Sequence, residues 1–265
     1  MTNSASQLGP PLQANTSDVL RSFQAHGLDD LREARLTDRI DTKYIVPKTQ
    51  LPWLLGQLIE QYSVLEIGDR RIFCYDNPYL DTADRSFYRM HHQGKLNRHK
   101  VRYRRYVDTR SSFLEIKLKN NIGRTLKSRR PCPFDSQHID AASEFLAEHL
   151  KPEHRQLEPS QLNSFRRIAL ASETFGERVT FDIDLEFTSP CETVSKSLPE
   201  TCIAELKQLR RTPCSLFARL MRDLGNRPTP FSKYCIGTAL TNPALKSNRF
   251  KRQMVKLTKL NPNQS

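Results

Sequence analysis

The sequence predicts an α+β domain whose antiparallel sheet closes into a barrel with an ionic interior. Segments in which apolar and charged residues alternate recur along the chain, and a period of two is typical of β-strands. Amphipathic helical segments interrupt them without a strand–helix–strand rhythm, which favours an antiparallel sheet. The charged faces contain few of the Ser, Thr and Gln residues that dilute a sheet face in contact with solvent.

The strands are predicted from this alternation. In the segment 101–104, Val101 and Tyr103 are apolar, whereas Arg102 and Arg104 are charged. The cleanest case is "VTFDIDLEF", in which every second residue is apolar. The predicted strands are, in chain order, 38–46, 63–67, 71–80, 98–107, 112–120, 124–131, 163–171, 177–188 and 202–209.

The helices are predicted from apolar stripes at helical spacing. In the segment 47–62, Leu51, Leu54, Leu55 and Leu58 fall on one face. Further helices are expected in pieces over 18–36, and over 84–94, 136–150, 213–224 and 231–240. We see no linker that would divide the chain, so residues 18–242 are interpreted as one domain. Residues 1–17, rich in Ser, Asn, Gln and Pro, are expected to be disordered.

The charge balance predicts a polyanionic partner. The 265 residues contain 42 Lys and Arg against 29 Asp and Glu, a net charge of +13. Such an excess suits phosphate chains, nucleic acid or an anionic membrane surface. Residues 243–265 contain basic residues and no acid, and they are interpreted as a mobile basic tail. This tail is also a candidate contact for a membrane or a protein partner.

Several other classes of site lack support. The six cysteines show no CxxC or Cys/His ligand spacing, so they are interpreted as free thiols in a reducing compartment. No apolar run approaches the length of a membrane helix, and a cytoplasmic location is expected. Glycine phosphate loops, G-x-S-x-G and H-E-x-x-H are absent. No carboxylate or nucleophile spacing surrounds His91 and His92, which are interpreted as helix-surface residues.

The ionic faces allow two interpretations. One is an ordinary half-buried sheet whose polar face meets solvent. The other is a barrel with helices on an apolar outside and charges inside, and recurrence in at least five strands favours it. That interior would contain nine basic and five acidic residues: Arg39, Asp41, Lys43, Arg102, Arg104, Glu115, Lys117, Lys119, Lys127, Arg129, Asp182, Asp184, Glu205 and Lys207.

Such an interior requires an anion, because burying many like charges without a partner is prohibitive. The basic excess suits a polyphosphate in a hydrated cavity. The carboxylates would repel that anion unless a divalent cation lies between them, and carboxylate oxygens suit Mg²⁺ or Mn²⁺.

Six segments of the chain carry a resemblance to a known family. In chain order they are "DRIDTKYIV", "YLDTADRSFYRMHHQGKLNRHKVRYRRYV", "FLEIKLK", "FDIDLEF", "IAELK" and "FSKYCIG". In this order they resemble the polyphosphate polymerase domain of the vacuolar transporter chaperone (VTC) family, within the CYTH-like triphosphate tunnel superfamily. The match runs from about Arg39 to Leu240. The resemblance implies an eight-stranded antiparallel tunnel that binds the triphosphate of ATP with a divalent metal. It also implies growth of a polyphosphate chain from the terminal phosphate.

The resemblance also implies roles for individual residues. Glu205 matches the metal-associated glutamate of the family, and we expect Asp182 or Asp184 to join it at the metal. Two departures from the family pattern are Phe165, where the family has tyrosine, and Pro230, where fungal enzymes have a second lysine. The residues implied at the reacting phosphates are Lys43, Arg102, Arg104, Lys117, Arg167 and Lys233. Further phosphate contacts are assigned to Arg39, Lys119, Lys127, Arg129 and Lys207.

Three functions remain open at this point. The first is nucleotide-dependent synthesis of polyphosphate, and the second is hydrolysis of inorganic triphosphate or of the 5′-triphosphate of RNA in the same tunnel. The third is a module that binds polyphosphate or nucleic acid without catalysis, since Tyr103 and Tyr106 alternate with arginines that could accompany base stacking. The acids Asp182, Asp184 and Glu186 argue against an open nucleic-acid groove.

Overall fold

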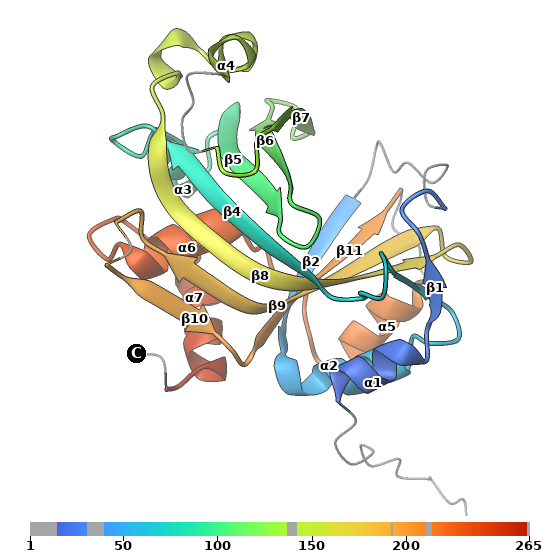
Figure 1. Ribbon diagram of the computed structural model, residues 1–265. Helices are drawn as coiled ribbons and strands as arrows, with labels where there is room; N and C mark the ends of the chain where they lie inside the picture. The colour runs from blue at the N-terminus through green and yellow to red at the C-terminus, as the bar shows by residue number, and fades with distance from the viewer. Residues whose placement is uncertain (1–14, 31–39, 137–141, 192, 210–213, 264–265) are drawn as a thin grey trace, which may run out of the picture.

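The computed structural model describes residues 15–30, 40–136, 142–191, 193–209 and 214–263, and it confirms an α+β fold with one large antiparallel sheet. Figure 1 shows the sheet curving strongly, with helices around it. Eight strands form its main path, in the spatial order β2-β11-β9-β8-β4-β5-β6-β7. These strands are β2 (Ile40–Pro47), β4 (Phe73–Asp81), β5 (Arg98–Tyr106), β6 (Ser111–Lys119), β7 (Thr125–Cys132), β8 (Glu158–Ser172), β9 (Glu177–Thr188) and β11 (Thr201–Gln208).

The sheet is an open tunnel rather than the closed barrel that we expected. All neighbours along the main path are antiparallel, but no pairing joins the end strands β2 and β7 among the described residues. Three short strands lie off this path: β1 (Gln24–His26), β3 (Ser63–Leu65) and β10 (Ser195–Leu198). The sequence analysis predicted β3 but missed β1 and β10.

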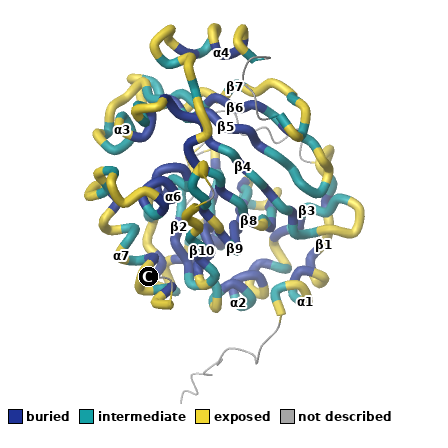
Figure 2. Tube along the Cα trace, turned by 60° about the vertical axis from the view of Figure 1, so that its left-hand side comes forward, coloured by how far each residue is buried: buried dark blue, intermediate teal, exposed yellow. Residues whose placement is uncertain are grey.

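Helices cover the apolar outer face of the sheet. One core cluster joins α1, α2 and α5 to strands β2, β8, β9 and β11, with Leu54 and Phe181 fully buried in it. A second joins α3 and α4 to β5 and β6, where Tyr103 is 3% exposed, so Tyr103 packs outside under a helix and does not stack bases. Figure 2 shows this burial along the strands. The helices are α1 (Thr16–Arg21), α2 (Leu51–Gly56), α3 (Ser86–His92), α4 (Ser143–His149), α5 (Leu216–Asp223), α6 (Lys233–Thr241) and α7 (Lys251–Leu260).

A β-bulge reverses the alternation of β9. The register against β8 shifts between Ser164 and Arg166, and opposite this shift Asp184 has a φ of 51°. Before the bulge, Ile183 packs in the outer core; after it, Leu185 and Phe187 pack with the residues of α6. The expectation that all apolar residues of "VTFDIDLEF" point outward is therefore wrong beyond Ile183.

The C-terminal segment packs on the domain, so our expectation of a mobile tail is wrong for residues 248–260. A 3₁₀ turn (Asn248–Phe250) leads into α7. Phe250 and Leu257 are 6% and 1% exposed, and both belong to the core around α6. The apolar residues of this segment recur at helical spacing, which is typical of a helix that packs on a core. Of the tail predicted at residues 1–17, residues 1–14 lie outside the described residues, and the prediction is wrong for Thr16 and Ser17, which begin helix α1.

We predict that Leu257→Ala destabilises the protein by about 2–4 kcal/mol, because it removes a fully buried side chain from a packed core. Urea unfolding of the full chain measures the free energy. Val255→Ala on the same helix is the control, since Val255 is 46% exposed and its loss should cost under about 0.5 kcal/mol. Equal, small effects of both substitutions would show that α7 contributes nothing to the fold.

Candidate functional site

Cationic side chains from five strands and one helix line the concave face of the sheet. They alternate with the outward apolar residues of the same strands, because successive side chains of a strand point to opposite faces. The set is Lys43 on β2, Lys100, Arg102 and Arg104 on β5, Lys117 on β6, Arg167 on β8, Lys207 on β11 and Lys233 on α6. The charge of Lys43, on a strand that does not pair with β6, adds to the effects that lower the pKa of Lys117.

Several of these cations stand directly opposite one another. Lys117 is the cross-strand partner of Lys100 on one side and of Lys127 on the other. Like charges in this relation are destabilising. Burial and the charge of Arg102 hold the pKa of Lys117 well below its ordinary value, and burial lowers the pKa of Lys100 to about 8. The face thus carries more positive charge than its own carboxylates neutralise.

Glu115 is the carboxylate at one wall of the tunnel. It is 1% exposed and accepts hydrogen bonds from Nε and Nη2 of Arg102 at 3.0 and 2.7 Å. Lys127 lies 2.5 Å away and Arg104 3.7 Å away. Burial opposes ionisation, but Arg102, Arg104 and Lys127 hold the pKa of Glu115 well below its usual range. Glu115 therefore anchors the cations of β5 and β7.

Arg104 has an unsatisfied hydrogen-bond donor inside the tunnel. Its Nε is buried and has no hydrogen-bond partner within the described part of the chain. Burial, together with the charge of Arg102, lowers the pKa of Arg104. A buried guanidinium with an open donor is suited to a ligand oxygen, since an unsatisfied buried donor costs about 1–3 kcal/mol.

Asp182 organises the opposite wall. It accepts hydrogen bonds from Nε and Nη2 of Arg167 at 2.5 and 2.8 Å, a bidentate pair, and it also accepts from Lys233. Burial opposes ionisation of Asp182, but these two cations hold its pKa far below the usual value. Burial lowers the pKa of Lys233 to about 8 despite the contact with Asp182.

Glu205 is the third inward carboxylate. Lys207 lies 2.9 Å and Lys43 3.3 Å from its oxygens. Burial would raise the pKa of Glu205, but Lys43 and Lys207 depress it well below its ordinary range. Glu205 faces Lys43 directly across the β2–β11 pair, which explains why the two residues meet.

Helix α6 brings Lys233 into the tunnel. Ser232 caps the helix by accepting from the backbone N–H of Cys235, and its hydroxyl also accepts from Lys100 at 2.8 Å. A Cβ at Gly237 would overlap Phe187 and Gln161, so only glycine lets the helix lie this close to β8 and β9. The glycine and the serine cap together place Lys233 beside Asp182.

Aromatic rings complete the wall next to the cations. Tyr75 and Phe165 are stacked, with ring centroids 5.3 Å apart. Arg104 and Arg167 lie over the ring of Tyr75 at 5.1 and 5.2 Å, and Lys233 lies 4.4 Å from the centroid of Phe165. Phe165, which replaces the family's tyrosine, thus faces the site through its ring.

The remaining predicted residues lie at the margin of the site or away from it. Lys119 ends β6, and Arg129 is exposed with its guanidinium over Phe113 at 4.9 Å. Asp184 is directed away by the bulge: it binds Lys48 at 2.5 Å and pairs with Arg166, an exposed residue. Our assignment of Asp184 to the metal is therefore not supported by its position. Arg39 lies outside the described residues.

Sequence reasoning missed Lys100, Ser232 and Tyr79 as members of the site. Tyr79 accepts a hydrogen bond from Arg102 at 3.1 Å and stacks on Tyr234 of α6. Lys100 could have been found, because it precedes Arg102 by two residues and so shares its face. Tyr79 lies on β4 directly across from Arg102, so finding it required the pairing of β4 with β5. Ser232 depends on how α6 docks, for which we found no signal in the sequence.

The carboxylates suit a divalent cation only in part. No group of three or more His, Cys, Asp and Glu side chains gathers at one point in the described ranges. Glu205 and Asp182 offer the hard oxygens that Mg²⁺ and Mn²⁺ prefer, but each is already bound to two cations. An ion at Glu205 would take most of its ligands from phosphate oxygens and water, as Mg²⁺ commonly does.

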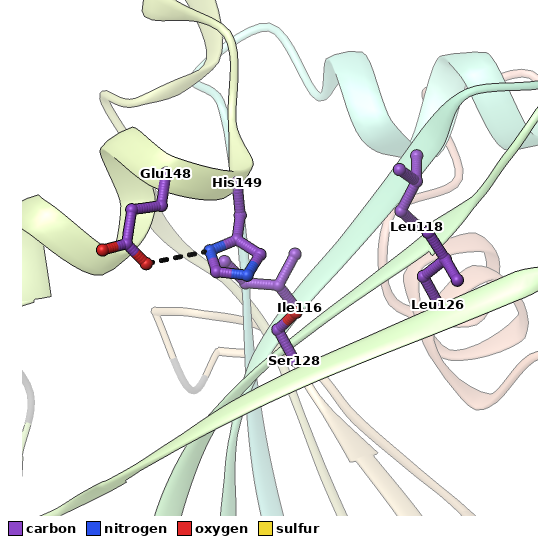
Figure 3. A pocket seen from close by; sticks show the side chains of 6 residues that line it. All are labelled: Ile116, Leu118, Leu126, Ser128, Glu148 and His149. Atoms are coloured by element: carbon purple, nitrogen blue, oxygen red, sulfur yellow. Dashed lines mark ion pairs between the residues drawn. The ribbon is translucent and has the colours of Figure 1, made fainter. Parts of the chain in front are cut away.

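A small pocket lies outside the tunnel, between α4 and the outer face of β6 and β7 (Figure 3). Its walls are mainly Ile116, Leu118 and Leu126, with His149 and Glu148 at the rim. Because Ile116 and Leu118 alternate with the inward residues of β6, the pocket faces away from the site. We assign it no part in the chemistry.

The chain matches a known protein family. The model for the VTC domain matches residues 38–242. The chain belongs to the VTC domain family. No curated protein matches the sequence. In the described part of the chain, no helix is long and apolar enough to cross a membrane.

Solved structures with a similar chain path share little sequence with this VTC domain. A putative adenylyl cyclase from Hippeastrum, described as revealing a dominant triphosphatase activity, has 14% identity and a TM-score of 0.47, covering 76% of this chain and 95% of that one. A Pyrococcus horikoshii protein has 12% identity and a TM-score of 0.44, covering 78% and 99%. A putative adenylate cyclase from Vibrio parahaemolyticus has 13% identity and a TM-score of 0.41, covering 82% and 97%.

We predict that Glu115→Gln destabilises the ligand-free protein by about 3 kcal/mol, because it leaves Arg102, Arg104 and Lys127 without their common counter-charge. Urea unfolding measures the loss, and Glu148→Gln, at an exposed carboxylate of α4, is the control. Added tripolyphosphate should restore more stability to Glu115→Gln than to the wild type. Equal stability of both variants would mean that the cations do not depend on Glu115.

Proposed function

We propose that this chain is a polyphosphate polymerase-like phosphotransferase. It binds the triphosphate of ATP, or a polyphosphate chain, along the cationic wall of the tunnel, and it transfers the terminal phosphate to a growing polyphosphate. The single observation that carries this proposal is the set of like charges facing one another inside the sheet, Lys100 and Lys127 on either side of Lys117. Membership of the VTC domain family supports it.

A linear polyanion fits this wall better than a compact ligand. The cations extend along β5 at every second residue, from Lys100 through Arg102 to Arg104, and face Arg167 and Lys233 on the other wall. Successive phosphates of a chain can each meet a cation from both walls. The bidentate donors of arginine suit phosphate oxygens, and the lysines supply point charges.

Phosphoryl transfer requires positioning and charge neutralisation more than covalent chemistry from the protein. Arg167 is held by Asp182, and Arg102 by Glu115, so both guanidinium groups are oriented before the substrate arrives. Arg104 has an open donor for the equatorial oxygens of the transferring group. Lys233 and Lys43 lie where they can neutralise charge on the leaving or attacking oxygen.

Glu205, with Asp182 nearby, would hold a divalent ion, Mn²⁺ or Mg²⁺. Such an ion polarises the transferring phosphate and neutralises charge that develops on its oxygens. Glu205 offers the more accessible carboxylate, because its two cations lie at 2.9 and 3.3 Å and neither makes a bidentate pair. Displacing Lys43 from Glu205 would also free that lysine for the substrate.

Hydrolysis of a triphosphate is the alternative reaction for the same site, with water in place of a phosphate acceptor. The experiment that separates the two uses purified protein, ATP, Mn²⁺ and a short polyphosphate primer. Growth of polymer, resolved by gel electrophoresis, supports the polymerase. Release of orthophosphate without growth supports hydrolysis, and absence of both with intact binding supports a module that only binds.

We predict that Arg104→Gln lowers kcat by about 10²–10³-fold, because it removes a charge aimed at the transferring phosphate. The same variant should be as stable as the wild type, or more so, since the described residues offer the buried Nε no hydrogen-bond partner and the substitution removes one of several like charges. Steady-state rates and urea unfolding measure the two effects together. Arg219→Gln, an exposed arginine of α5, is the matched control. Loss of stability with unchanged kcat would give Arg104 a structural role.

Binding should also depend on pH in a defined direction. Burial lowers the pKa of Lys100 and of Lys233 to about 8, and a bound polyanion would raise both values. The affinity for tripolyphosphate is then greatest below pH 8 and falls as the pH rises through 8 towards the pKa values of the bound state.

Calorimetry at pH 8 in buffers of different ionisation enthalpy should show that protons are taken up on binding. Lys100→Gln should take up fewer protons than the wild type, whereas Lys196→Gln, on β10, should match the wild type. Proton release, or an affinity independent of pH between 7 and 9.5, would contradict this account.

A further inference from the structure

A second cationic group lies at one end of the tunnel, where β5 begins and β6 ends. Arg98 and Lys119 are direct cross-strand partners there, so two like charges stand opposite each other, as they do deeper in the tunnel. Burial and the nearby charge of Arg249 lower the pKa of Arg98. Arg98 shares its face with Lys100, two residues on, so this group continues the inner row outward.

Arg249 comes from the C-terminal segment, outside the residues that match the VTC family model. Gly94 precedes β5 and has a φ of 75°; a Cβ on it would lie 2.6 Å from Nη1 of Arg249. The guanidinium thus packs directly on the backbone of Gly94. Glycine is favoured here because it adopts the positive φ without strain, and its missing side chain leaves room for the guanidinium.

The segment that carries Arg249 is anchored on both sides. Tyr88 donates a hydrogen bond to the carbonyl of Lys246 at 2.9 Å, and Nε2 of His92 lies 2.7 Å from Oδ1 of Asn248. Phe250 is 6% exposed and packs against Tyr88 and His91. The position of Arg249 is therefore built by the fold.

His91 lies among these charges and is not the plain helix-surface residue that we expected. Its Nδ1 is buried and has no hydrogen-bond partner in the described residues. Burial and the charges of Lys100, Arg98, Arg249 and Lys119 lower its pKa to about 2. The imidazole is neutral in the free protein, because a proton on it would add another positive charge beside these cations. An anion bound to the cations would reduce the repulsion among them.

We propose that Arg98, Lys119 and Arg249 form an outer subsite that binds phosphates of a polyphosphate chain beyond the part held inside the tunnel. This inference rests on the proposed function, because it extends the same row of cations. Polyphosphate fits better than nucleic acid, since Tyr88 and Phe250 are buried and offer no ring for base stacking. It fits better than a membrane, because the row leads inward to Lys100.

The outer subsite predicts that affinity depends on chain length. Arg249→Ala should raise the Kd of a polyphosphate of several tens of phosphates by about three- to fivefold, since an exposed charge pair contributes up to about 1 kcal/mol. The Kd of tripolyphosphate, which fits within the tunnel, should change by less than about twofold. Arg249→Glu should enlarge the difference, and Arg249→Lys should retain most of the affinity for long chains.

The measurement is a titration of the full chain with each polyphosphate at several salt concentrations. Arg219→Ala is the control for loss of an exposed arginine, and thermal unfolding of every variant checks the fold. The slope of log K against log salt for long chains should fall by about one when Arg249 is removed. The slope for tripolyphosphate should stay the same.

Three outcomes would overturn the subsite. Arg249→Ala could leave the binding of long chains unchanged, or it could weaken both ligands equally. It could also weaken binding to RNA or to anionic phospholipid vesicles while polyphosphate binding stays intact, which would assign the surface to that partner. Failure of the wild type to bind tripolyphosphate at all would instead contradict the proposed function, so the two failures are distinguishable.

Discussion

Repulsion between like charges on the inner face of the sheet is the constraint on which the rest of this structure depends. Lys117 stands between Lys100 and Lys127, and three carboxylates hold the surrounding cations in place without neutralising all of them. Hydrophobic burial on the outer face must offset this cost, and helices cover most of that face. The protein therefore keeps these like charges close together at the expense of its stability.

Most of the fold could be predicted because apolar and charged residues alternate along the strands, which marks both faces of the sheet. The eight long strands and the inner positions of Arg102, Glu115 and Lys117 followed from alternation alone. The sheet's open seam could not be predicted, because closure depends on whether β2 and β7 pair, and neither strand carries a signal for its partner. Asp184 was misplaced because it is itself the residue at the bulge, with a positive φ, and no pattern in the sequence marks a bulge there.

The site was harder to predict than the sheet that carries it. Residues on strands share a face by spacing, which is why Lys43, Arg104, Glu205 and Asp182 could be assigned to one interior. Residues contributed by docking, among them Ser232, depend on close packing that no spacing encodes. The basic C-terminal segment was misjudged for a different reason: its charges were interpreted alone, although Phe250 and Leu257 at helical spacing indicated a packed helix.

The bulge in β9 gives a single strand two different tasks. Its first half presents Asp182 to the cations, and its second half turns Leu185 and Phe187 towards helix α6. The surface on which helix α6 packs and the carboxylate that binds its first residue thus belong to one continuous piece of backbone. The single bulge in that strand therefore sets both where the helix rests and where the charge of Lys233 is neutralised.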